Sequence, residues 1–224
     1  MSDPQLIDEL RGALASQRVL IADGHHRFEV ALSRRRLFGG VLSYFCWAGD
    51  PALLLHPIHR IVEIPPAAHA AWQTQLAALC DLVPLPDRQA LNRWLASAQG
   101  QGGFGYAQAA QVYGLRLRQE ILADWLLHPT VPQPLADLDV VILHHVLLPR
   151  LGGGSTAPAV RAYTPDQAKA LAMVEAQPGI CAWLLRPLVL AQTFALAAQG
   201  MLLPPKSTYF YPKVLSGLCI HPAD

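Results

Sequence analysis

Hydrophobic residues recur at helical spacing in several stretches of the chain. Leu6, Leu10 and Leu14 form one such stripe, directly after Asp3-Pro4. An aspartate followed by proline is typical of a helix start, because the carboxylate caps free N–H groups and proline suits the first turn. The same spacing between turn residues predicts further helices at residues 28–37, 68–80, 87–98, 139–148, 165–177 and 188–199.

Short apolar runs bounded by turn residues predict strands between these helices. They span residues 19–22, 41–47, 53–63, 104–108, 112–118 and 180–185. Helices and strands alternate irregularly, which predicts a mixed α/β or α+β fold rather than a barrel. Pro65-Pro66 marks a boundary, so we expect a segment 1–65 and an α+β domain 66–224 that ends in PPKSTYFYPK.

Composition narrows the class of protein. Of the 224 residues, 52% are hydrophobic and only 15% are charged, which excludes a disordered tail or a coiled coil. A net charge of +1 provides no basic field, so a nucleic-acid partner is not expected. The apolar run 180–203 is interrupted by Arg186-Pro187, so no membrane span is expected. Four dispersed cysteines without C-x-x-C spacing indicate free thiols in a reducing, cytoplasmic compartment.

The sharpest chemical signal is VLIADGHHRFE, where a predicted strand, a polar turn and a helix start follow one another. Free N–H groups at a helix start attract anions, and Gly24 lets the backbone approach a ligand closely. Arg27 adds a planar guanidinium that suits phosphate. These parts predict a phosphate-binding turn.

The turn also contains groups that can move protons or hold a metal. His25 and His26 can donate to phosphate or transfer protons near neutral pH. Asp23 can hold Mg²⁺ or accept a proton from a substrate hydroxyl. The alternative is a polar turn in which Asp23 caps the helix beside surface histidines.

A second signal lies near the C-terminus, in PPKSTYFYPK. Lys206, Ser207 and Thr208 can bind an anionic group, and Tyr209 and Tyr211 can flank a base or a sugar. The alternative is an edge strand or loop whose aromatic side chains complete the core. The residue types leave both interpretations open.

A third signal is HPIHR, but it favours no transition metal. His56 and His59 face opposite sides of a strand, and the adjacent pair His144-His145 lies within a predicted helix. No P-loop, dinucleotide-binding or nucleophile-elbow motif is present. Four residues complete the candidate binding set at lower priority: Glu29, His59, Arg60 and Lys213.

Four segments, IADGHHRFEVAL, HPIHR, LDVVILHHVLL and PPKSTYFYPKVLSGL, resemble in the same order those of the uncharacterised DUF-1015 family. The resemblance runs from about Ile21 to Leu218. Family members are longer, and these motifs belong to their C-terminal half. The resemblance therefore implies a half-length chain without the strands that neighbour residues 19–22, whose missing half is absent or is a separate polypeptide.

The DGHHR turn is also similar to the phosphate-binding turn of the ParB/sulfiredoxin superfamily, which includes CTP-binding partition proteins, sulfiredoxin and a free-serine kinase. This similarity implies that Gly24, His25, His26 and Arg27 contact phosphate and that Asp23 orients a metal or a substrate.

Together these signals predict a nucleotide- or phosphate-binding protein and a candidate small-molecule phosphotransferase. The expected cofactor is ATP, ADP or CTP with Mg²⁺, and Lys206 is expected to close over the same site. Two alternatives remain. One is a nucleotide-responsive, DNA-associated regulator of the ParB type. The other is an inactive half-length homologue that needs a partner chain.

Overall fold

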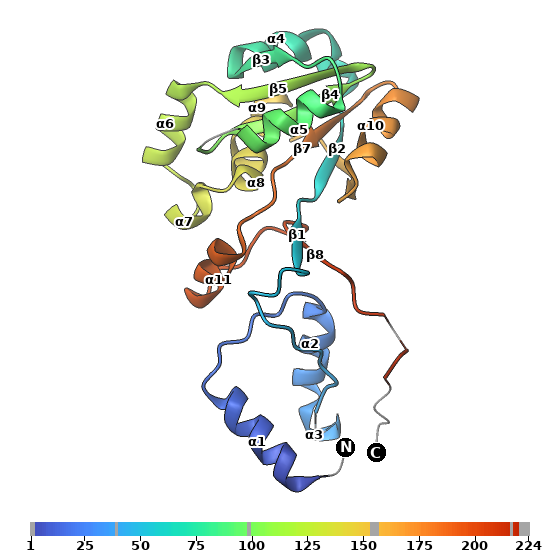
Figure 1. Cartoon of the computed structure of the whole chain (residues 1–224). Coiled ribbons are helices and arrows are strands. Elements are labelled where there is room, and N and C mark those ends of the chain that lie inside the picture. Colours follow the sequence, from blue (N-terminus) through green and yellow to red (C-terminus); the bar gives the residue numbers. More distant parts are fainter. Residues whose placement is uncertain (1–2, 39, 98–99, 153–156, 216, 220–224) are drawn as a thin grey trace. The chain divides into compact units, whose positions relative to one another are not determined.

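The computed structural model of the protein describes residues 3–38, 40–97, 100–152, 157–215 and 217–219 (Figure 1). Its contacts divide the chain into two units. Unit 1 comprises residues 1–47 and 213–224, and unit 2 comprises residues 48–212. The expected boundary at Pro65 lies inside unit 2, because the residues before it supply a strand of that unit's main sheet.

Unit 2 is built on a six-stranded sheet in the order β3-β5-β4-β7-β2-β6, and every neighbouring pair is antiparallel. The predicted pairing of residues 104–108 with 112–118 is confirmed, with Phe104 opposite Leu115. The strands are β2 (His59–Glu63), β3 (Cys80–Pro84), β4 (Gly103–Gln108), β5 (Gln111–Leu117), β6 (Val160–Thr164) and β7 (Ile180–Leu184). Strands β3 and β6 were not predicted from the apolar pattern.

Helices cover both faces of this sheet (Figure 1). Helices α5 and α10 contribute to one hydrophobic cluster, and α4, α6 and α7 to α9 contribute to the other. The helices of unit 2 are α4 (His69–Leu79), α5 (Arg88–Ser97), α6 (Gln119–Leu127), α7 (Gln133–Ala136), α8 (Asp139–Ile142), α9 (Leu148–Leu151), α10 (Gln167–Ala176) and α11 (Leu190–Ala198). A 3-10 turn η1 (Pro66–Ala68) precedes α4, and a π-helix η2 (Leu143–Leu147) joins α8 to α9.

The period-two alternation of the strands assigns their side chains to the two clusters. On β7, Ala182 packs with α5 and α10, whereas Trp183 packs in the larger cluster on the opposite face. Ile61 and Val62 of β2 divide in the same way. The mixed α/β class predicted from the sequence is confirmed, and unit 2 has a complete core.

A two-stranded antiparallel sheet lies beside the main sheet in unit 2. It pairs β1 (Leu54–His56) with β8 (Tyr209–Tyr211), so that His56 lies opposite Tyr209 (Figure 1). The run predicted as one strand at 53–63 is therefore split, because the chain leaves the small sheet at His56 and enters the main sheet at His59.

Unit 1 contains α1 (Pro4–Ala15), α2 (His25–Ser33) and α3 (Arg35–Phe38). The predicted cap is confirmed, since Asp3 Oδ1 accepts a hydrogen bond of 3.0 Å from the Gln5 N–H. The strands predicted at 19–22 and 41–47 are wrong. Neither segment is a strand of the sheets that the described residues form. No described helix is long and apolar enough to cross a membrane.

Candidate phosphate-binding turn

The DGHHR turn forms the start of helix α2 in unit 1. Gly24 is the N-cap, with a left-handed φ of 83°, and no side chain caps the helix. A Cβ at Gly24 would lie 2.9 Å from both Nε and Nη2 of Arg27, so the guanidinium lies directly against the turn. The first N–H groups of α2 have no carbonyl partner within the helix. Backbone donors and a guanidinium therefore lie together at this turn.

Asp23 is held by two contacts that do not involve the helix itself. Its Oδ1 accepts from the Gly24 N–H at 2.8 Å, and its Oδ2 accepts from Lys213 Nζ at 3.2 Å. Both Asp23 and Lys213 belong to unit 1, although 190 positions separate them in the chain. The alternative of a helix capped by Asp23 is not what the structure shows, because Asp23 binds the N–H of the N-cap residue instead.

The turn carries charges of both signs. Partial burial opposes ionisation of Asp23, but hydrogen bonds from Lys213 and Gly24 and the charge of Arg27 lower its pKa below the ordinary value. Lys213 balances the ionised Asp23 carboxylate, and the Glu29 carboxylate of the same helix lies beside His26. The Arg27 guanidinium, which lies against the turn, suits one phosphate group.

Both histidines of the turn project into solvent. His25 and His26 are exposed, and His26 Nδ1 lies 3.4 Å from the Glu29 carboxylate in a solvated pair. A pair of this kind adds little to stability. The imidazoles are therefore available to a ligand at the helix start.

The predicted residues of PPKSTYFYPK divide between the two units. Lys213 contacts the turn in unit 1, whereas Lys206, Ser207, Thr208 and Tyr209 belong to unit 2. The proposed closure of Lys206 over the turn stays a prediction. In unit 2 the Ser207 hydroxyl is buried and donates to the Pro204 carbonyl at 2.6 Å.

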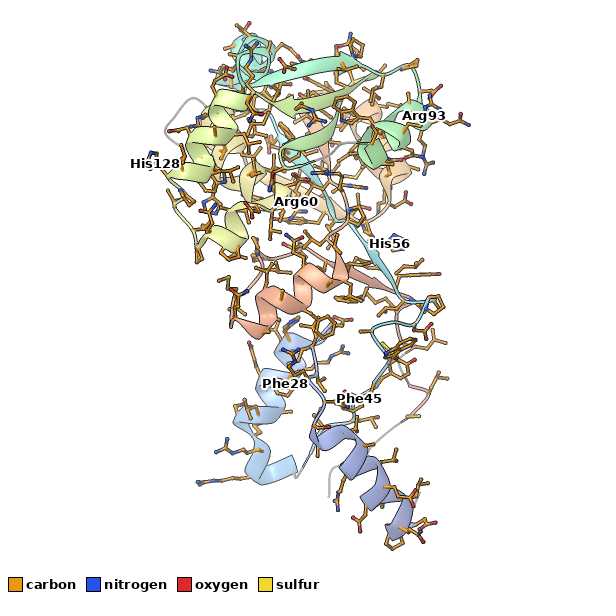
Figure 2. All side chains as sticks on the ribbon, turned by 60° about the vertical axis from the view of Figure 1, so that its left-hand side comes forward. Phe28, Phe45, His56, Arg60, Arg93 and His128 are labelled. Carbon is orange, nitrogen blue, oxygen red and sulfur yellow. The ribbon has the colours of Figure 1, made fainter. Side chains whose placement is uncertain are left out.

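Arg60 of β2 contacts residues of three sequence motifs, HPIHR, LDVVILHHVLL and PPKSTYFYPK. Its guanidinium is fully buried and donates to His144 Nε2 at 3.3 Å, to the Ile58 carbonyl and to the Lys206 carbonyl at 3.0 Å (Figure 2). Burial lowers the pKa of Arg60 to about 10. The three motifs thus meet in one buried network that fastens the Lys206 turn to the main sheet. Nothing in the sequence pattern indicates this contact.

The neighbouring histidines are neutral parts of the same core. Leu185 N–H donates to His59 Nδ1 at 3.2 Å. Burial, followed by the charge of Arg60, lowers the pKa of His59 to about 4, and the same two causes lower the pKa of His144 to about 4. Arg60 and His59 were predicted as lower-priority ligand contacts; in the structure all three guanidinium nitrogens of Arg60 donate within unit 2, and His59 Nδ1 accepts from Leu185.

A cavity of about 360 Å³ opens beside this network in unit 2. Its polar wall includes Asp139 and Arg186, which form an ion pair of 2.6 Å between Oδ2 and Nη2. Asp139 accepts hydrogen bonds from the Arg186 guanidinium and from the Gly102 N–H, each at 2.8 Å. These two charged groups therefore already bind one another.

Metal binding has limited support. In the described part of the chain, no three His, Cys, Asp or Glu side chains gather as a metal cluster. Asp23 supplies a single carboxylate at the turn. One carboxylate suits Mg²⁺ only when phosphate oxygens and water complete the coordination.

A mixed α/β fold with a charged turn at a helix N-terminus is the class that these observations define. The chain belongs to the family described as "Protein of unknown function (DUF1015)", whose profile matches residues 1–141. No curated protein matches the sequence.

Some solved structures resemble the chain distantly. A conserved hypothetical protein from Pyrococcus furiosus is 13% identical, with 92% of this chain and 81% of that chain covered and a TM-score of 0.43. Two structures of a free serine kinase in complex with AMP, one of them a mutant, are 11% identical, with 94% of this chain and 81% of each covered; their TM-scores are 0.42 and 0.41.

Proposed function

We propose that the protein binds the phosphate group of a nucleotide at the turn from Asp23 to Arg27 and that it is a small-molecule phosphotransferase. The supporting observation is the uncapped start of α2, where Gly24 brings the backbone close to the Arg27 guanidinium. Helix N-termini with an adjacent arginine favour phosphate through both N–H donors and charge.

Each residue of the turn has a distinct part in this proposal. The N–H groups of His25 and His26 and the Arg27 guanidinium bind phosphate oxygens. The exposed imidazoles of His25 and His26 donate to phosphate or exchange protons with an acceptor group. Lys213 lies 3.2 Å from Asp23 and adds a second cation to the same turn.

Asp23 would hold Mg²⁺ together with nucleotide oxygens, and the ion would neutralise phosphate charge during transfer. Because Asp23 is paired with Lys213, the cation competes with the ammonium for one carboxylate. Removing Lys213 should therefore weaken nucleotide binding without Mg²⁺ more than nucleotide binding with Mg²⁺.

Isothermal titration of the full chain with ATP, ADP and CTP, each with and without Mg²⁺, tests the proposal. Arg27→Ala should weaken binding of the preferred nucleotide by at least tenfold, which is about 1.4 kcal/mol. Lys213→Ala should have a smaller effect. If Lys206 closes over the same site, as predicted, Lys206→Ala should also weaken nucleotide binding. Lys169→Ala on α10 is the control and should bind as the wild type does.

Two results would contradict the proposal. One is nucleotide binding that Arg27→Ala leaves unchanged. The other is the absence of binding by every nucleotide in a preparation that unfolds cooperatively, which would favour an inactive homologue that needs a partner chain. A phosphate-transfer assay on a bound nucleotide then separates an enzyme from a binding protein.

A further inference from the structure

The cavity in unit 2 has a wall that one buried ion pair holds in place. The Asp139 carboxylate accepts from Arg186 and from the Gly102 N–H, and Arg186 Nη2 also donates to the Gly100 carbonyl at 2.6 Å. The side chains of Asp139 and Arg186 are only 11% and 19% exposed. These contacts join the three segments that supply most of the lining: 100–101, 137–140 and 185–192. The shape of the cavity is therefore fixed by the protein itself.

Three other polar side chains of the lining take no part in this framework. Gln101, Asp137 and Gln192 are half-buried, and none of them has a hydrogen bond or an ion pair to another described residue. The cavity volume of about 360 Å³ lies near the lower end of the roughly 300–1,000 Å³ of small-molecule sites. The cavity thus offers three unused polar groups to a compact ligand.

The Asp137 carboxylate determines which ligand group suits the cavity. Asp139 and Arg186 neutralise each other, whereas Asp137 forms no ion pair within the described part of the chain. The buried Arg60 guanidinium is not part of the lining, and it donates to the Ile58 carbonyl instead. A carboxylate binds a protonated amine through a charge-assisted hydrogen bond. The amide oxygens of the two glutamines can accept the remaining protons of an ammonium group.

The rest of the lining favours an organic cation over a hydrated metal ion. Leu138 and Leu185 are buried and line the cavity together with the half-buried Leu188. Apolar side chains gain by covering a hydrocarbon chain, whereas a hydrated metal ion offers them no apolar surface. An amine with a short aliphatic chain therefore matches both the polar and the apolar parts of the wall.

We propose that this cavity binds a small aliphatic primary amine in its protonated form. The ammonium group binds the Asp137 carboxylate and the amide oxygens of Gln101 and Gln192, and the hydrocarbon chain lies against the leucines. This inference does not depend on phosphate binding at the DGHHR turn, because every residue that it uses belongs to unit 2.

Nuclear magnetic resonance of the full ¹⁵N-labelled chain tests the proposal by titration with three probes of similar size: n-butylammonium, 1-butanol and butyrate. Butylammonium should shift the amide resonances of residues 137–140 and 185–192 in a saturable way. The uncharged alcohol and the anion should bind at least tenfold more weakly, because neither forms an ion pair with Asp137.

Asp137→Asn keeps the shape of the side chain and removes its charge, so the dissociation constant of butylammonium should rise at least tenfold. Asp124→Asn is the matched control, because Asp124 is exposed on α6 of unit 2 and does not line the cavity. Thermal melting checks that both variants are folded, and the three probes on the wild type decide the question without any variant.

Three results would overturn the proposal. They are the absence of a saturable shift with butylammonium, equally tight binding of 1-butanol or butyrate, and unchanged affinity in a folded Asp137→Asn variant. Each of these results would leave the proposed phosphate site intact, because nucleotide binding and its loss in Arg27→Ala are measured separately.

Discussion

Units 1 and 2 contain similar polar motifs, but unit 2 buries them and unit 1 exposes them to solvent. Unit 2 buries HPIHR and part of PPKSTYFYPK around Arg60, where their polar groups bind one another. Unit 1 leaves DGHHR in solvent, with its helix N-terminus uncapped. Polar residues whose hydrogen bonds are made inside the core stabilise the fold, whereas exposed polar residues at a helix start are candidates for binding a ligand. The same kind of motif thus has a structural part in one unit and a proposed binding part in the other.

The largest expected effect is the loss of Arg60. Arg60→Ala removes a buried guanidinium and leaves the Lys206 and Ile58 carbonyls without a donor. We expect a loss of about 2–6 kcal/mol in the free energy of unfolding, because each buried carbonyl left without its donor costs about 1–3 kcal/mol. Urea unfolding measures it. Arg93→Ala on the exposed side of α5 is the control and should change the free energy by less than about 0.5 kcal/mol (Figure 2). Equal effects of the two substitutions would contradict the claim that Arg60 of HPIHR stabilises the fold.

Acid should weaken unit 2 through His59. The unfolded histidine takes a proton near its ordinary pKa of 6.5, whereas burial lowers the pKa in the fold to about 4. The unfolded chain therefore binds more protons between these values, and the free energy of unfolding falls as the pH falls through this window, by up to about 1.4 kcal/mol per pH unit. Urea unfolding at pH 7.5 and pH 5 should show this slope in the wild type and in His128→Gln, but less of it in His59→Gln. An unchanged slope in His59→Gln would contradict the assignment.

Two glycines give a smaller contrast between the units. A Cβ at Gly114 of β5 would overlap the Trp94 indole, so Gly114→Ala should cost about 1–3 kcal/mol of unfolding free energy. Gly12 lies within α1 and has nothing within 4 Å of such a Cβ. Gly12→Ala should be neutral or favour the helix by up to about 1 kcal/mol. Thermal melting of both variants checks the pair, and a destabilised Gly12→Ala would show that unit 1 is packed.

Local signals in the sequence were sufficient to predict many of the helices and strands. Asp3-Pro4 determines the start of α1 through neighbouring groups alone, and the close strands β4 and β5 pair across a short turn. The segment 41–47 also has the composition of a strand, but pairing depends on a neighbour that composition does not reveal.

Contacts between distant residues account for what could not be predicted. Asp23 with Lys213, and Arg60 with Lys206, join residues 190 and 146 positions apart. The candidate turn itself was identified from DGHHR. The distinction between Lys213 in unit 1 and Lys206 in unit 2 required the structure, because both lysines lie in one short motif.

Hydrogen exchange with mass spectrometry, with and without ATP and Mg²⁺, tests the phosphate site most directly because it locates the ligand along the chain. Binding at the DGHHR turn should slow exchange in residues 23–33 of the wild type and have no such effect in Arg27→Ala. Protection confined to unit 2, for example at residues 185–192 beside the cavity, or equal protection in Arg27→Ala, would contradict the proposed site.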